Sequence, residues 1–207
     1  VTFLRQDHGI ETKTEITVVK DRNAEIRRYT FTNTTAADVD LELTTYSEAI
    51  LAPHADDESH RVFNSMRVQT EYDKEHEMLV LSRGGQSAKE GRSYAMHKLF
   101  LLDEGDGAST MAPEYETSRL KFIGRGNSLR HPEVIESHRT LTGTVGTTLD
   151  PIMSMRRRVR VEAGKQVQVV LLQGFGKARE QLTEIAESYL HELDITHAFE
   201  TTTVFTN

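Results

Sequence analysis

The most regular feature of the chain is an alternation of apolar and polar residues, which is typical of half-buried β-strands. In the clearest example, Val39, Leu41 and Leu43 alternate with acidic residues. This pattern predicts one dry and one wet face, as in an antiparallel sheet. Alternation or a short apolar run predicts five further strands, at residues 12–20, 25–32, 66–73, 78–81 and 94–102.

Two pairs of neighbouring strands are expected to form hairpins. The first pair is joined by Asp-Arg-Asn at residues 21–23. The second spans residues 152–172 and turns at the glycine-containing segment 162–165, and we expect it to lie centrally in a sheet. Its predicted buried side chains are Val159, Val161, Val167, Val169 and Leu171.

Convincing helical spacing occurs in one segment, residues 177–193, which follows Gly174 and Gly176. A helix after a long β region often covers a sheet edge or leads into another domain. Its expected apolar face consists of Ala178, Leu182, Ile185, Ala186, Tyr189 and Leu193.

The strand pattern fails in three places. Residues 53–61 hold two histidines and three acids, which permits a metal site, but a solvated loop is the better interpretation because ligands must converge in space. Residues 82–92 contain glycines without the Lys-Ser/Thr of a phosphate loop. Residues 103–107 predict a tight acidic turn that lacks the ligand pattern of a calcium loop.

Together these elements predict an all-β fold of two packed antiparallel sheets with one C-terminal helix. We place a β-sandwich domain at residues 1–176 and the helix, with the start of a linker, at residues 177–207. Residues 140–149, rich in threonine and glycine, are expected to be irregular or a frayed strand.

The longest stretch that core formation alone does not explain is residues 115–132. Gly124 and Gly126 predict a turn whose backbone visits φ > 0, so we expect a strand that runs into a basic loop. Such a loop can hold anions or sugar hydroxyls; the alternative is a surface loop with its charges in water. The candidate carbohydrate- or anion-binding residues are Arg119, Arg125, Asn127 and Arg130.

A second basic feature is the row Arg156, Arg158 and Arg160 on one face of a predicted strand. One interpretation is a ladder for a carboxylate, phosphate or sugar. The favoured alternative is a solvated sheet face paired with nearby acids, since surface ion pairs of this kind are common.

Composition narrows the function classes. A net charge of −7 argues against a nucleic-acid binder. The absence of cysteine excludes disulfides and thiolate metal sites, and no apolar run approaches the ~18 residues that span a bilayer. We expect no metal, no cofactor, no membrane contact by this part of the protein and a cytoplasmic location. No catalytic residues are predicted, because the scattered histidines form no Ser-His-Asp or carboxylate-pair constellation.

Several short motifs occur in unbroken order along the chain. They are DHGIET at 7–12, EIRR at 25–28 with TN at 32–33, LAP at 51–53, the stretch 115–132, LTGTVG at 141–146, and LDPI at 149–152 before RRRV at 156–159. In this order they resemble the N-terminal β-sandwich of the inverting phosphorylases of glycoside hydrolase family 94. Within that family the phosphorylase-like region of cyclic β-1,2-glucan synthases is the most similar. The resemblance covers residues 3 to about 195.

The resemblance implies a supersandwich, galactose-mutarotase-like fold whose earlier strands precede Val1. It also implies a linker helix, which residues 198–207 begin to match before they diverge, and an (α/α)₆ barrel after it. In such enzymes the barrel holds the general acid and, with inorganic phosphate as nucleophile, cleaves the β-glucosidic bond. No barrel lies within this sequence, so the isolated chain is expected to have no phosphorylase activity.

Three functions remain open. The chain could be a non-catalytic module of a β-glucan phosphorylase or synthase that positions substrate or associates with another subunit, possible homodimers included. It could instead be a freestanding carbohydrate-binding module, or a purely structural dimerisation domain. Freestanding sugar binders usually expose aromatic platforms, and this chain has no tryptophan and 7% aromatic residues. That composition favours the first function, with β-glucan oligosaccharide, inorganic phosphate and the barrel as partners.

Overall fold

The computed structural model describes residues 1–85, 90–102 and 112–206, with the side chains of 203–206 left aside. Its strands are β1 (Thr2–Asp7), β2 (Ile10–Val18), β3 (Ala24–Asn33), β4 (Val39–Thr44), β5 (Val68–Asp73), β6 (Met78–Gly84), β7 (Arg92–Leu101), β8 (Glu114–Ser118), β9 (Gly146–Thr147), β10 (Pro151–Val161) and β11 (Gln166–Gly176). Its helices are α1 (His54–Met66), α2 (Arg119–Ile123), α3 (Glu133–Glu136), α4 (Arg179–Ser188) and α5 (Glu192–Thr206).

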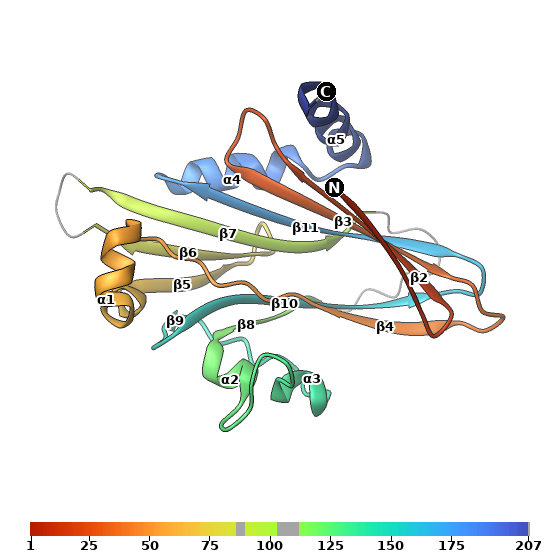
Figure 1. The fold of residues 1–207 in the computed structure, drawn as a ribbon, viewed down its shortest axis with the longest axis horizontal. Helices are drawn as coiled ribbons and strands as arrows, with labels where there is room; N and C mark the ends of the chain where they lie inside the picture. The colour runs from red at the N-terminus through yellow and green to blue at the C-terminus, as the bar shows by residue number, and fades with distance from the viewer. Residues whose placement is uncertain (86–89, 103–111, 207) are drawn as a thin grey trace.

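Two packed sheets form the centre of the molecule, as predicted. The larger sheet has the strand order β1–β2–β3–β11–β7–β6–β5–β9, and the smaller has the order β4–β10–β8. Helices α4 and α5 cover the outer side of the larger sheet, α2 and α3 lie beyond the smaller sheet, and α1 stands at one end (Figure 1). The molecule therefore has four layers: helices α4 and α5, the larger sheet, the smaller sheet, and the segment that contains α2 and α3.

The alternation in the sequence is reproduced by the burial of side chains. Leu41 and Leu43 of β4 pack partly buried against the core between the sheets, while Asp40 is exposed. Strand β6, the predicted apolar run, lies between β5 and β7 in the larger sheet. It is buried on both faces, because its side chains contribute alternately to the apolar clusters on the two sides of that sheet. The first predicted hairpin, β2 with β3, is also confirmed.

The second predicted hairpin is wrong, although its five apolar side chains are all buried as expected. Strand β10 pairs with β4 and β8, whereas β11 pairs with β3 and β7 in the other sheet. Val159 and Val161 of β10 face the same core as Val167 and Val169 of β11, so the two strands face each other across it instead of lying side by side. Buried Asn33 stabilises this corner: its Nδ2 donates to the carbonyl of Val161 (2.9 Å) and its backbone N–H to that of Lys165 (2.9 Å).

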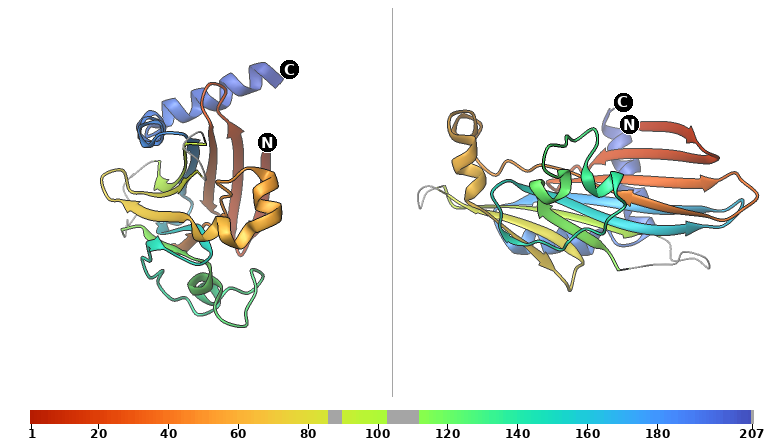
Figure 2. Two further views of the ribbon diagram at one scale, coloured as in Figure 1. Left: turned by 90° about the vertical axis from the view of Figure 1, so that its left-hand side faces the viewer. Right: turned by 90° about the horizontal axis from the view of Figure 1, so that it is seen from below.

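The predicted single helix is two helices. Helix α4 ends at Ser188, and Tyr189 leaves the helical conformation with φ −129° and ψ 51° before α5 begins. Leu182, Ile185 and Ala186 are buried as predicted, but Leu193 is 83% exposed because it belongs to the second helix. Figure 2 shows the two helices running in different directions.

The segment expected to be a loop at residues 53–61 is mostly helix α1. Sequence periodicity missed it because its inward face is polar: Asn64 is the buried residue of the helix, and its Oδ1 accepts a hydrogen bond from Arg83 (2.8 Å). Val62 and Phe63 point to solvent instead, with 68% and 57% exposure. A helix whose apolar residues lie outside does not show the usual core-facing pattern.

Two predicted connections lie partly or wholly outside the described residues. The acidic turn at 103–107 is one, and residues 86–89 of the 82–92 connection are the other. The segment 140–149 is irregular apart from the two-residue strand β9, as expected.

Candidate ligand-binding loop

The basic stretch begins with a strand, as predicted, but a short helix separates the strand from the loop. Strand β8 ends at Ser118, whose Oγ accepts a hydrogen bond from the backbone N–H of Lys121 at the start of α2 (3.5 Å). Gly124 then ends α2, and the loop proper runs to Pro132. Arg119 is therefore a helical residue, and only the other three candidates lie on the loop.

Glycine is required where the loop leaves the helix. Gly124 has φ +85° and Gly126 φ +82°, as the sequence predicted. At Gly124 an added Cβ would also come within 2.7 Å of the Cβ of Glu133 and closer still to its carboxylate. Larger residues would have to displace α3, so the loop and α3 are packed closely together.

The loop is fixed at its base by a small apolar cluster, whose buried members are Phe122, Ile123, Val134, Leu141 and Ile152. The ring of Tyr46 packs on Phe122 with 5.1 Å between centroids. The His131 N–H donates to the Ser128 carbonyl (3.0 Å) and closes the tip. The basic side chains therefore project from a segment with buried supports.

The four candidates divide into two environments. Arg119 is engaged: it lies 3.3 Å from a carboxylate oxygen of Glu48 and 3.5 Å from one of Asp150. Arg125, Asn127 and Arg130 are exposed, and neither arginine has an ion pair within the described part of the chain. The structure thus keeps three of the four residues available for a ligand and places the fourth in a separate polar cluster.

That cluster, centred on Glu48, was missed from the sequence. Glu48 accepts hydrogen bonds from Tyr46 Oη (2.5 Å), Arg61 (3.3 Å) and Arg119 (3.3 Å). Burial and then the Glu48 hydrogen bond raise the pKa of Tyr46 to about 12. Arg119 lies 71 residues from Glu48, and no local pattern signals a contact over that distance.

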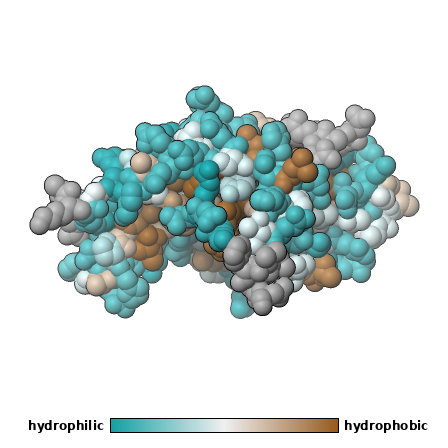
Figure 3. All heavy atoms as spheres, turned by 90° about the horizontal axis from the view of Figure 1, so that it is seen from above, coloured by the Kyte–Doolittle hydropathy of each residue, from teal (hydrophilic) through white to brown (hydrophobic). Residues whose placement is uncertain are grey.

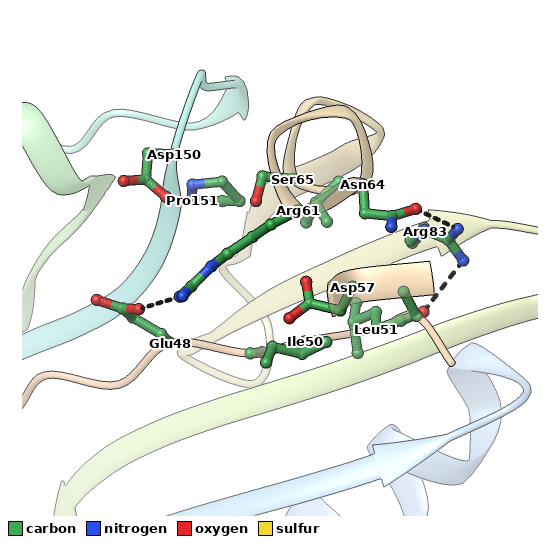
Figure 4. Close-up of a pocket in the computed structure, with 13 residues that line it drawn as sticks. Glu48, Ile50, Leu51, Asp57, Arg61, Asn64, Ser65, Arg83, Asp150 and Pro151 are labelled. Atoms are coloured by element: carbon green, nitrogen blue, oxygen red, sulfur yellow. Dashed lines mark hydrogen bonds and ion pairs between the residues drawn. The ribbon is translucent and has the colours of Figure 1, made fainter. Parts of the chain in front are cut away.

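A small cavity adjoins the Glu48 cluster beneath α1. Glu48, Arg61 and Asp150 stand at one side, while Asn64 and Arg83 close the other through their hydrogen bond (Figure 4). Its volume is about 20 Å³, which is room for a single water but not for a sugar or phosphate. The cavity is therefore not a candidate binding site.

The histidine-rich segment does not form a metal site. His54 lies 3.5 Å from Glu58 one turn along α1, an ordinary helical pair. Among residues 1–85, 90–102 and 112–206 no three His, Asp or Glu side chains are placed to hold an ion. The expected loop is instead a helix, and the absence of a bound metal stays a prediction.

The arginine row is paired with acids, as favoured, but it is not uniformly solvated. Arg160 is exposed beside Asp38 (3.1 Å), and Arg158 is half-buried beside Glu42 and Glu114. Arg156 is 1% exposed because the segment around α3 covers it. Its guanidinium donates to the carbonyls of Arg139 (2.6 Å) and Val134 (3.1 Å), so it supports the loop segment and is not available to a ligand.

The family model "Glycosyl hydrolase 94, supersandwich domain" matches residues 1–192. The chain belongs to this family. The match confirms the resemblance seen in the sequence, and it agrees with the two antiparallel sheets of the structure.

Among curated proteins, the cyclic β-(1,2)-glucan synthase NdvB of Rhizobium meliloti is 32% identical over 195 residues. The alignment covers 94% of this chain and 7% of that relative, so this chain spans a small part of its length.

Two solved structures are similar at low identity. One is a polysaccharide lyase, with 14% identity, a TM-score of 0.47, and coverage of 87% of this chain and 22% of that one. The other is a Klebsiella pneumoniae protein assigned as an aldose 1-epimerase, with 7% identity, a TM-score of 0.36, and coverage of 90% and 52%. Such values support no functional conclusion.

In the part of the chain that the structure describes, no helix is both long and apolar enough to cross a bilayer.

Proposed function

We propose that this chain is a non-catalytic module of a β-glucan phosphorylase or cyclic β-1,2-glucan synthase, and that its basic loop contributes polar contacts to sugar or phosphate. The observation that carries the proposal is the exposure of Arg125, Asn127 and Arg130 on a loop whose base is buried. Membership of the supersandwich family and the similarity to a glucan synthase support the same role.

The chemistry of the three side chains suits such a ligand. Each guanidinium offers paired donors for phosphate oxygens or neighbouring sugar hydroxyls. The amide of Asn127 can both donate and accept. Two free arginines do not make a complete site, so another domain supplies most contacts and the isolated chain binds with a Kd on the order of millimolar.

The test is a titration of the isotope-labelled chain with β-1,2-gluco-oligosaccharides and, separately, inorganic phosphate. The ligand should change the amide shifts of residues 124–130. An Arg125→Ala, Arg130→Ala double variant should no longer show these ligand-induced changes. Arg160→Ala with Lys165→Ala is the matched control, since it removes two exposed positive charges elsewhere. Equal shifts in the parent and in the loop variant would refute the proposed contacts.

A second measurement addresses catalysis. We expect the isolated chain to release no glucose 1-phosphate from β-1,2-glucans, because the proposed module leaves the chemistry to an (α/α)₆ barrel. Turnover above background by protein free of contaminating enzymes would contradict a non-catalytic role.

The proposed partners are the barrel domain, a β-glucan and, in a homodimer, a second copy of the module. A cytoplasmic location, with any membrane attachment made by other parts of the parent protein, belongs to the same proposal. Fractionation of cells that express the full-length parent, with protease accessibility of this module as the readout, tests the location.

A further inference from the structure

A groove outside the basic loop opens where β11 leaves the larger sheet and leads into α4. It has a volume of about 430 Å³ and lies between the segment 50–53, the start of β7 and the end of β11. A second groove of about 620 Å³ adjoins it beside the β2–β3 turn, and the two share Asn23, Phe175 and Gln181. The surface viewed from above carries apolar side chains scattered among polar ones (Figure 3).

Phe175 stands where the two grooves meet, and its position follows from the local sequence Gly-Phe-Gly. An added Cβ at Gly174 would lie 3.0–3.1 Å from Met96 and Ile185, and one at Gly176 would lie 2.9 Å from Gln181. The glycines thus allow α4 to approach one face of β11. Phe175 points to the opposite face, because side chains alternate along a strand, and it remains 48% exposed.

Polar groups on the groove walls have unused hydrogen-bonding capacity. In the described part of the chain, neither the side-chain amide of Asn23 nor the hydroxyl of Tyr94 has a hydrogen-bond partner. The charged groups of the lining already have partners: Lys177 Nζ donates to Ser93 Oγ at 2.9 Å, and the carboxylate of Glu90 pairs with Arg83 at 2.7 Å, so the groups left without partners are uncharged. The lining therefore suits an uncharged ligand that is rich in hydroxyl groups.

We propose that this groove binds a short, uncharged β-linked gluco-oligosaccharide. One pyranose face packs on Phe175, and the sugar hydroxyls bond to Asn23 and Tyr94. Aromatic rings provide apolar contact area, and pockets of roughly 300–1,000 Å³ are typical of small ligands. The second groove beyond Phe175 lets an oligosaccharide continue, so several linked sugars bind better than one. The inference rests on the proposed function and adds a sugar contact separate from the basic loop.

The experiment uses the whole 207-residue chain and a linear β-1,2-linked glucopentaose as the probe. Saturation-transfer NMR and amide shifts are measured for the parent, for Phe175→Ala and for Phe3→Ala. Phe3→Ala is the matched control, because Phe3 is also an exposed strand phenylalanine, at 57%. We expect Phe175→Ala to weaken binding at least tenfold, Asn23→Ala about threefold, and Phe3→Ala not at all.

Melting curves of each variant, compared with the parent, show whether the fold is intact, and Phe175→Leu provides a second variant that keeps an apolar side chain while removing the ring. Unchanged affinity of Phe175→Ala would refute sugar binding in the groove. Amide shifts confined to residues 124–130 would refute sugar binding in the groove but leave the proposed function standing. If no amide shift moved anywhere, both proposals would be refuted. Inorganic phosphate should move the amide shifts of the loop and leave those of the groove residues unchanged. Equal phosphate-induced shifts in the groove would contradict an uncharged ligand.

Discussion

The two outer layers of the molecule are attached to their sheets by different chemistry. Helix α4 packs on the larger sheet through apolar side chains such as Leu172, Leu182 and Ile185. The segment around α2 and α3 packs on the smaller sheet through a small apolar cluster together with Arg156, a buried cation. Apolar burial is non-directional, whereas a buried cation requires acceptors in specific positions.

The buried acid Glu116 on the smaller sheet likewise requires specific hydrogen-bond partners. Its Oε1 accepts the backbone N–H groups of Thr117 (2.9 Å) and Ser118 (2.8 Å), and its Oε2 accepts the hydroxyl of Thr142 (2.5 Å). These bonds join the end of β8 to the segment before β9. The layer that carries the candidate loop is thus held in one arrangement by directional polar contacts.

The largest effect is expected on the apolar side. Leu172→Ala removes a fully buried side chain and should lower the free energy of unfolding by about 2–5 kcal/mol, through lost burial and the cavity left behind. Val18→Ala, at a 61% exposed strand position, is the control and should cost less than about 0.5 kcal/mol. Urea unfolding measures both; similar midpoints would show that the α4 layer is not part of the cooperative core.

A pH-dependent effect is expected at the interface between the sheets. His97 is fully buried: its Nε2 bonds with Thr45 Oγ1 (2.7 Å) and its Nδ1 with Gln173 Nε2 (3.1 Å). Burial, and then the charge of Arg27, lowers the pKa of His97 from 6.5 to about 3. Between about pH 3 and pH 6.5, His97 is therefore protonated in the unfolded chain but not in the folded protein. Stability is therefore complete above pH 6.5 and falls by roughly 1.4 kcal/mol per pH unit below it.

Unfolding measured between pH 7 and pH 5 checks this expectation, because few carboxylates titrate in that range. His97→Gln should be less stable at pH 7 but should show a shallower pH dependence. An equal slope in both proteins would mean that another group binds the proton.

A loss of stability somewhat smaller than that of Leu172→Ala is expected at Arg156. Arg156→Ala leaves Glu42 and Glu114 without their buried cation and removes the donors to the carbonyls of Val134 and Arg139. Both carboxylates keep some contact with water, so we expect a loss of about 2–3 kcal/mol, below the range for a fully enclosed pair. Hydrogen exchange should rise mainly at residues 132–141.

Arg160→Ala is the matched comparison, since Arg160 lies on the same strand face but pairs with Asp38 at the surface. It should change stability by less than about 0.5 kcal/mol. If the two arginine variants behaved alike, directional polar contacts would not be what holds this layer.

Much of the fold could be predicted from local sequence. Alternation located β4 and the β2–β3 hairpin, and the glycines at 124 and 126 correctly indicated a backbone with φ > 0. Of the four candidate residues, three could be placed on an exposed loop from the sequence, because glycines and basic residues occur together there, and their contact with a ligand stays a prediction. Arg119 could not be separated from them, since its acid partners come from distant parts of the chain.

What the sequence by itself determined is which apolar side chains of the strands are buried and where the backbone turns, because both depend on a residue and its near neighbours. Tertiary structure alone decided which sheet each strand joins, as β10 and β11 show: equally apolar strands can pair side by side or pack face to face. It also decided the burial of Arg156, the outward apolar face of α1 and the groove around Phe175. Each of these depends on what another segment places opposite, and periodicity along one strand or helix carries no information about that segment.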